Sequence, residues 1–60
     1  MIKDPNILLS VVNTKLRDFY DSLDSLCDDL DYDKEEIIRI LKSIGYIYNK
    51  DLNQFVITSI

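Results

Sequence analysis

Few residues of this chain have side chains suited to catalysis. Histidine is absent, and Cys27 is the single cysteine, so no base is present to turn it into a nucleophile. One glycine in 60 residues leaves no Gly-rich loop that could cradle a phosphate. One cysteine without histidine also does not provide the ligands of a zinc site. We expect Cys27 to be a small core residue and the chain to have no enzymatic activity, cofactor, metal or small-molecule substrate.

Alternating carboxylates at Asp29, Asp31 and Asp33 imitate the opening of a calcium-binding loop. The rest of that motif is missing. Lys34 stands where the glycine of the tight turn belongs, and Ile40 stands where the bidentate glutamate belongs. Capping of a helix explains Asp33 more simply, so we do not predict a calcium site.

Basic residues on a predicted third helix and on the hairpin that follows it could contact DNA: Lys34, Arg39, Lys42 and Lys50. The electrostatic balance opposes this use, because seven Lys and Arg face eleven Asp and Glu, giving a net charge of −4. Glu35 and Glu36 also occupy the helical turn that would face the bases. The alternative is that these cations lie on a solvent-exposed face of an acidic domain and only offset part of its negative charge.

Capping residues and apolar spacing predict the helices that would position these groups. Asp4 before Pro5 is a strong helix start, and Asp33 with Glu36 three residues later resembles a capping box. Gly45 is expected in a left-handed conformation just after the third helix. An apolar stripe in the first helix runs through Leu8, Val11, Val12, Leu16 and Phe19. The predicted helices span about 5–18, 22–30 and 34–44.

The segment 22–41 has the layout of a helix-turn-helix. Either Asp21 or Ser22 can cap its first helix, Cys27 provides a small residue in the middle, and Asp31 tolerates a left-handed backbone at the turn. Any three-helix domain with a tight second connection would show similar spacing. This layout therefore indicates an architecture and not a function.

After the third helix the pattern changes to β-prone residues. Tyr46–Tyr48 and Gln54–Ile57 flank the turn-prone segment 49–53, which predicts a hairpin at about 46–57 with a five-residue loop. We therefore predict one domain over residues 1–60, mainly α, a three-helix bundle with a helix-turn-helix core and a C-terminal β-hairpin like the wing of a winged helix.

Four segments of the chain resemble a family of short bacterial proteins catalogued as a domain of unknown function. They are Lys3-Asp-Pro-Asn-Ile-Leu-Leu-Ser-Val-Val-Asn-Thr-Lys-Leu-Arg-Asp18, Leu23-Asp-Ser-Leu-Cys27, Gly45-Tyr-Ile-Tyr48 and Asn53-Gln-Phe55. The resemblance extends from residue 3 to about residue 56. It implies a stand-alone bacterial protein, and it implies no activity, ligand or partner.

Aromatic and apolar residues of the hairpin are the candidates for a protein interface: Tyr46, Tyr48, Phe55 and Ile57. Tyr46 and Tyr48 share one face of their strand, opposite Ile47, and a hairpin cannot bury both faces in one monomer. The sequence leaves open which face the helices cover, and the tyrosines could instead pack with their rings inward. The tail 57–60 adds apolar residues that could join a strand or a dimer.

The function class that remains is a small binding module acting through protein contacts, including contacts with a second copy of itself. A sequence-specific DNA-binding regulator that uses the third helix and the hairpin is the alternative. No segment resembles a secretory signal or a membrane span, so we expect a cytoplasmic protein without a membrane partner.

Overall fold

A computed structural model describes residues 1–58 of the chain. The elements are α1 (Pro5–Asp18), α2 (Leu23–Leu30), α3 (Lys34–Lys42), β1 (Tyr46–Asn49) and β2 (Gln54–Ile57). Three helices followed by an antiparallel hairpin confirm the predicted fold class. Residues 59 and 60, part of the apolar tail considered above, lie outside the described residues.

Each helix begins at the side chain of a capping residue. Asp4 accepts hydrogen bonds from the amides of Asn6 and Ile7, and Asp33 accepts them from the amides of Glu35 and Glu36. For α2 the capping residue is Ser22 rather than Asp21, since its hydroxyl accepts from the Ser25 amide. Local polar groups thus satisfy amides that no helical carbonyl can reach.

The third helix is shorter than predicted. It ends at Lys42, and the amides of Ile44 and Gly45 bond to carbonyls three residues back, at 3.2 and 2.9 Å. Gly45 follows in the left-handed region, with φ of +84°, as its place after the helix suggested. A tight turn therefore replaces the last two predicted helical residues and sends the chain into β1.

The helices pack around one apolar core. Its buried members come from all three helices and from β2: Leu8, Val12, Leu16, Leu23, Leu26, Cys27, Ile37, Leu41 and Phe55. Phe19, by contrast, is 74% exposed, although its spacing continues the apolar stripe. Phe19 lies one residue beyond the end of α1, where the chain leaves the helical path that buries Leu16.

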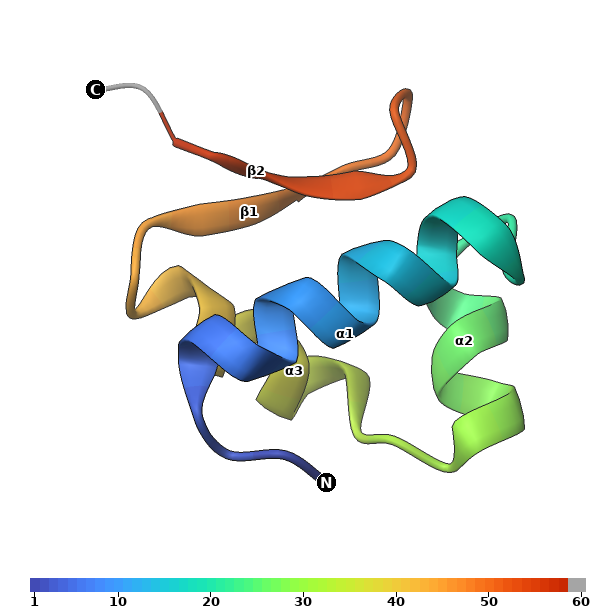
Figure 1. Cartoon of the computed structure of the whole chain (residues 1–60), viewed down its shortest axis with the longest axis horizontal. Helices are drawn as coiled ribbons and strands as arrows, with labels where there is room; N and C mark the ends of the chain where they lie inside the picture. Colours follow the sequence, from blue (N-terminus) through green and yellow to red (C-terminus); the bar gives the residue numbers. More distant parts are fainter. Residues whose placement is uncertain (59–60) are drawn as a thin grey trace.

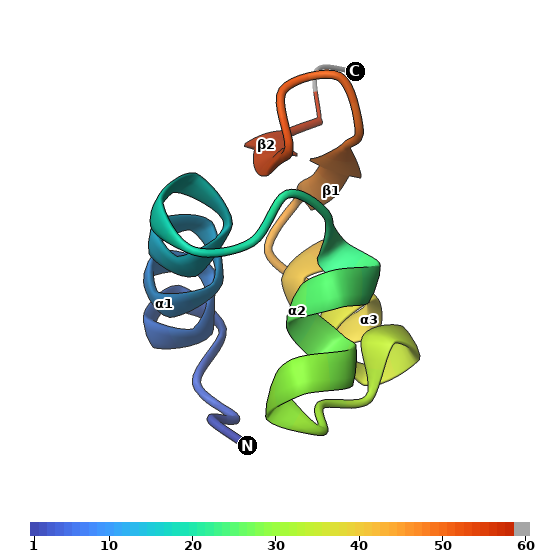
Figure 2. The ribbon, with the colours of Figure 1, turned by 90° about the vertical axis from the view of Figure 1, so that its right-hand side faces the viewer.

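In Figure 1 the hairpin runs above the helices, and in Figure 2 α1 lies on one side while α2 and α3 lie on the other. β2 packs against α1, and β1 packs against α3. The two strands therefore bridge the halves of the helical layer. The order α2, a short turn at Asp31–Asp33, then α3 is that of a helix-turn-helix unit, with Asp31 left-handed at φ of 56°.

The hairpin pairs Tyr46 with Ile57, Ile47 with Val56, Tyr48 with Phe55 and Asn49 with Gln54. Its loop is Lys50–Asn53, one residue shorter than predicted, because Asn49 belongs to β1. Phe55 is 2% exposed, whereas Ile47 is 45% exposed. Since neighbouring residues point to opposite faces of a strand, the face with Tyr48 and Phe55 meets the helices and the face with Ile47 meets solvent.

Candidate functional site

The hairpin is attached to α1 by a side-chain amide. Asn13 Nδ2 donates to the Phe55 carbonyl at 3.1 Å, and the Phe55 amide donates to Asn13 Oδ1 at 2.7 Å. The Asn13 side chain thus bonds to the edge of β2 in the way that a neighbouring strand would, because it pairs with both the amide and the carbonyl of Phe55. Both bonds are partly buried, so water competes poorly for them.

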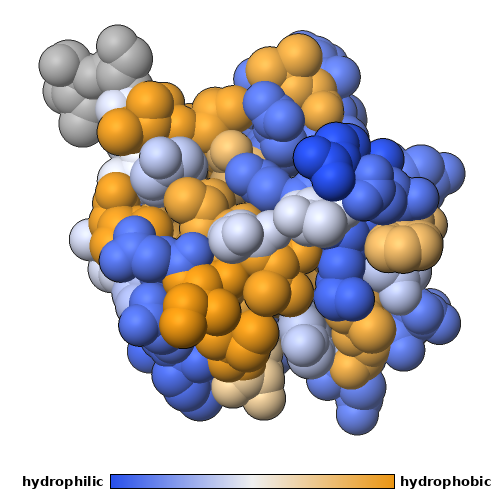
Figure 3. All heavy atoms as spheres, viewed as in Figure 1, coloured by the Kyte–Doolittle hydropathy of each residue, from blue (hydrophilic) through white to orange (hydrophobic). Residues whose placement is uncertain are grey.

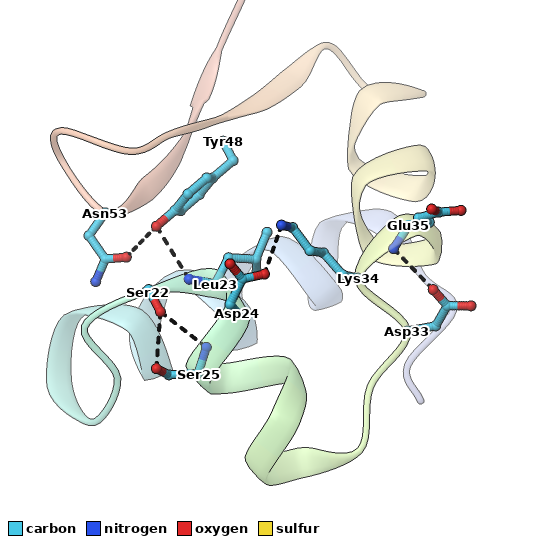
Figure 4. A network of polar contacts seen from close by, with 9 residues as sticks. All are labelled: Ser22, Leu23, Asp24, Ser25, Asp33, Lys34, Glu35, Tyr48 and Asn53. Carbon is cyan, nitrogen blue, oxygen red and sulfur yellow. Dashed lines mark hydrogen bonds and ion pairs between the residues drawn. The ribbon is translucent and has the colours of Figure 1, made fainter.

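A second attachment centres on Asn53 in the hairpin loop. Asn53 Nδ2 donates to the carbonyls of Leu16 and Tyr20, at 3.1 and 2.9 Å. These carbonyls are at or just beyond the C-terminal end of α1, where no later helical amide is present to donate to them. The Tyr48 hydroxyl donates to Asn53 Oδ1 at 2.6 Å and accepts from the Leu23 amide at 3.3 Å, as Figure 4 shows. Asn53 has φ of 52°, a left-handed conformation that asparagine tolerates well. One hydroxyl and one amide therefore join the end of α1, the start of α2 and the hairpin.

Burial and packing differ among the four hairpin residues predicted to form an interface. Phe55 is buried at 2% exposure, so we reassign it to the core, and the tilted Tyr48 ring packs 5.5 Å from its ring. Tyr46 is half-buried, and Ile57 is 65% exposed at the open end of the hairpin. The tyrosine face is thus turned toward the helices. The exposed apolar side chain of β1 is Ile47, on the face opposite the tyrosines.

The basic residues considered for DNA contact do not form one strip. Lys34 Nζ lies 2.7 Å from Asp24 Oδ1 on α2, and Arg39 Nη2 lies 3.8 Å from Glu36 Oε2 one turn back on α3. The ion pair with Asp24, drawn in Figure 4, raises the pKa of Lys34. Lys50 is in the hairpin loop, beyond the far end of β1 from α3.

Arg39 and Lys42 lie close together on the solvent side of α3. They line a shallow open hollow of about 500 Å³ together with Glu35, Ile38 and Ser43. The lining comes from α3 and its C-capping residue Ser43, so the hollow is a surface depression and lacks the convergent polar groups of a ligand pocket. Its walls carry one carboxylate beside two cations.

The alternating aspartates serve the local structure. Asp33 caps α3, Asp31 is the left-handed residue that ends α2, and Asp29 accepts a hydrogen bond from the Tyr20 hydroxyl. That bond raises the pKa of Tyr20. Over residues 1–58, no group of three or more His, Cys, Asp or Glu side chains is arranged to hold a metal ion.

Cys27 lies in the core, as predicted. Burial, followed by the nearby charge of Asp24, raises the pKa of its thiol. A raised pKa reduces the fraction of reactive thiolate at neutral pH. No helix among the described residues is both long and apolar enough to cross a lipid bilayer.

Fold and polar attachments together define a small, mainly helical protein with a C-terminal hairpin clamped onto its first helix. The chain belongs to the family Domain of unknown function (DUF4250), whose model matches residues 2–55. This confirms the resemblance seen in the sequence. Neither the curated proteins nor the solved structures gave a match.

The positions that carried this resemblance include the hairpin attachments: Asn13, Tyr48, Asn53 and Phe55. Sequence reasoning missed the two asparagines as structural residues. A signal was present in Asn53, since an asparagine at the end of a hairpin loop is a common left-handed residue. Asn13 gave no such signal.

Proposed function

We propose that this chain is a small non-catalytic module that acts through protein contacts made by its hairpin, including contacts between copies of itself. One observation carries the proposal: the hairpin is anchored on its inner face by partly buried polar bonds yet displays large apolar side chains to solvent. Ile47, Leu52 and Ile57 are 45%, 60% and 65% exposed. Exposed apolar residues gathered on one element are typical of interaction surfaces.

The space-filling view supports the same reading. In Figure 3 apolar side chains collect over the N-terminal half of α1 and over the hairpin, while polar side chains cover the region near the end of α1. Ile7 of α1 is 54% exposed. A monomer this small has little core with which to offset the cost of ordering its chain, so contact with another protein would add burial that it lacks.

DNA binding through α3 and the hairpin is the second candidate, favoured by the closeness of Arg39 and Lys42 on the exposed side of α3. Against it stands the placement of Lys34 and Arg39 beside carboxylates, those of Asp24 and Glu36, which would also face an approaching phosphate. The net charge of −4 repels a polyanion as well. We therefore place protein contacts first.

Sedimentation equilibrium across a wide range of protein concentration, with duplex DNA retention measured in parallel, tests this order. We expect an average mass that rises above one chain as concentration increases, and no retention of DNA. A monomer at every concentration, together with salt-sensitive DNA retention that is lost in an Arg39→Glu, Lys42→Glu variant, would replace this proposal with the second candidate.

A further inference from the structure

The outer edge of β1 carries backbone groups without a partner among residues 1–58. Phe55 directs its amide and carbonyl to Asn13, away from β1, so Tyr48 and Phe55 form a non-hydrogen-bonded pair of the ladder. Hydrogen-bonded and non-hydrogen-bonded pairs alternate along an antiparallel ladder. The Thr58 amide, three residues after Phe55, donates to the Gly45 carbonyl at 2.7 Å, as this alternation requires. Tyr46 and Tyr48 consequently direct their backbone amides and carbonyls away from β2.

The two edges of the hairpin are therefore not equivalent. Asn13 and the packing of α1 close the β2 edge at Phe55. In Figure 2 β1 lies on the side of the hairpin away from α1, above α3, against which it packs. Within the described chain, no side chain donates to or accepts from the backbone of Tyr46 or Tyr48. Such an edge is a template for one more extended strand.

We propose that a second copy of this chain fills that place, its β1 pairing antiparallel with the first β1 about a two-fold axis at Ile47. This inference rests on the proposed function and specifies its partner. In that arrangement Tyr46 of each copy is opposite Tyr48 of the other, and these are the residues whose backbone groups point outward. The two pairs exchange about four backbone hydrogen bonds and create a four-stranded sheet.

Side chains on the solvent face favour this pairing over a random extended segment. Ile47 stands opposite Ile47 of the second copy in a non-hydrogen-bonded pair, where Cα atoms approach to about 4.5 Å and side chains meet most closely. Val56 is the partner of Ile47 within each hairpin. The assembled sheet then carries an unbroken row of Val56, Ile47, Ile47 and Val56, and the partly exposed Ile47 side chain becomes covered.

The edge is short, and its length limits the strength of the contact. β1 has four residues, and Lys50 follows it directly. Short edge strands and lysine are devices that restrain uncontrolled strand addition. Because a two-fold pairing uses each β1 edge once and leaves the β2 edge covered by α1, association stops at a dimer.

Amide hydrogen exchange and sedimentation together test the inference. At high concentration the amides of Tyr46 and Tyr48 should exchange more slowly than at low concentration, while the Ile47 amide, already directed at β2, serves as the internal reference. Ile47→Lys places like charges across the axis and should raise the dissociation constant by about tenfold or more. Phe19→Lys makes the same change of an exposed apolar side chain just beyond the end of α1, outside the hairpin, and is the matched control.

The outcomes separate this inference from the proposal on which it rests. A dimer whose Tyr46 and Tyr48 amides keep their fast exchange, or which Phe19→Lys weakens as much as Ile47→Lys, overturns edge pairing while self-association stands. A monomer at the highest concentration reached overturns both edge pairing and self-association. Thermal melts of both variants establish that a lost dimer does not reflect a lost fold.

Discussion

Asn13 and Phe55 lie 42 positions apart in the sequence and exchange two hydrogen bonds, one in each direction. The bonds join the middle of α1 to the middle of β2, so they fix the position of the hairpin relative to α1. The same bonds orient the ladder, leaving the backbone of Tyr46 and Tyr48 at the open edge. This contact thus occupies the β2 edge of the hairpin at Phe55.

Asn13→Ala should lower the free energy of unfolding by about 1–3 kcal/mol, because it leaves the partly buried amide and carbonyl of Phe55 without partners. Urea unfolding followed by circular dichroism measures the change. Thr14→Ala, at the next and exposed position of α1, is the control and should change stability little. Equal stabilities of the two variants would contradict the role given to Asn13.

Replacements of Asn53 separate its backbone conformation from its hydrogen bonds. Asn53→Gly retains easy access to the left-handed region but loses the bonds to Leu16, Tyr20 and Tyr48. Asn53→Ala loses the bonds and adds the strain of a left-handed residue with a Cβ, which costs roughly a further 1 kcal/mol. Unfolding in urea should therefore rank stability as wild type, then glycine, then alanine. Glycine matching the wild type would show that the bonds contribute nothing.

Substitutions of Asp31 should stabilise the protein. Asp31 is left-handed and carries a negative charge at the C-terminal end of α2, where the helix dipole favours positive charge and no basic residue is present. Asp31→Asn removes the charge, and Asp31→Gly also relieves the backbone, so we expect gains rising to roughly 0.5–1 kcal/mol. Thermal melting measures both. A destabilised Asp31→Asn would mean that the carboxylate makes a favourable contact.

Cys27 should react slowly with iodoacetamide in the folded protein. Burial, and then the charge of Asp24, raises the pKa of the thiol, so at pH 8 a smaller fraction is thiolate than in an unfolded chain. Mass spectrometry over time gives the rate, and the same measurement in urea provides the reference. The rate should rise on unfolding. Equal rates in buffer and urea would place Cys27 outside the core.

Salt should act on the two candidate functions with opposite sign. Two copies of a chain with a net charge of −4 repel each other, so added sodium chloride should strengthen self-association by screening. DNA binding releases counterions and weakens steeply with salt. Sedimentation and DNA retention at low and high salt provide the comparison. Self-association that weakens on adding salt would point to ion pairs across the interface rather than a paired strand edge.

Sequence reasoning predicted the elements well, because helix starts and apolar periodicity act over a few residues. Asp4, Asp33 and Gly45 each do in the structure what their position along the chain suggested. The choice of Ser22 over Asp21 and the early end of α3 depended on one or two backbone conformations. The spacing of apolar and capping residues does not locate a helix end to within one or two residues.

Tertiary contacts decided the surface. The exposure of Phe19, the inward direction of Tyr48 and the pairing of Asn13 with Phe55 each depend on where a distant segment lies. Periodicity records which residues share a face of one element, but it does not record which neighbour covers that face. The sequence by itself therefore determined three helices followed by a hairpin. Packing of the hairpin on α1 decided which face is buried and which strand edge stays open, since long-range hydrogen bonds leave no local pattern in the chain.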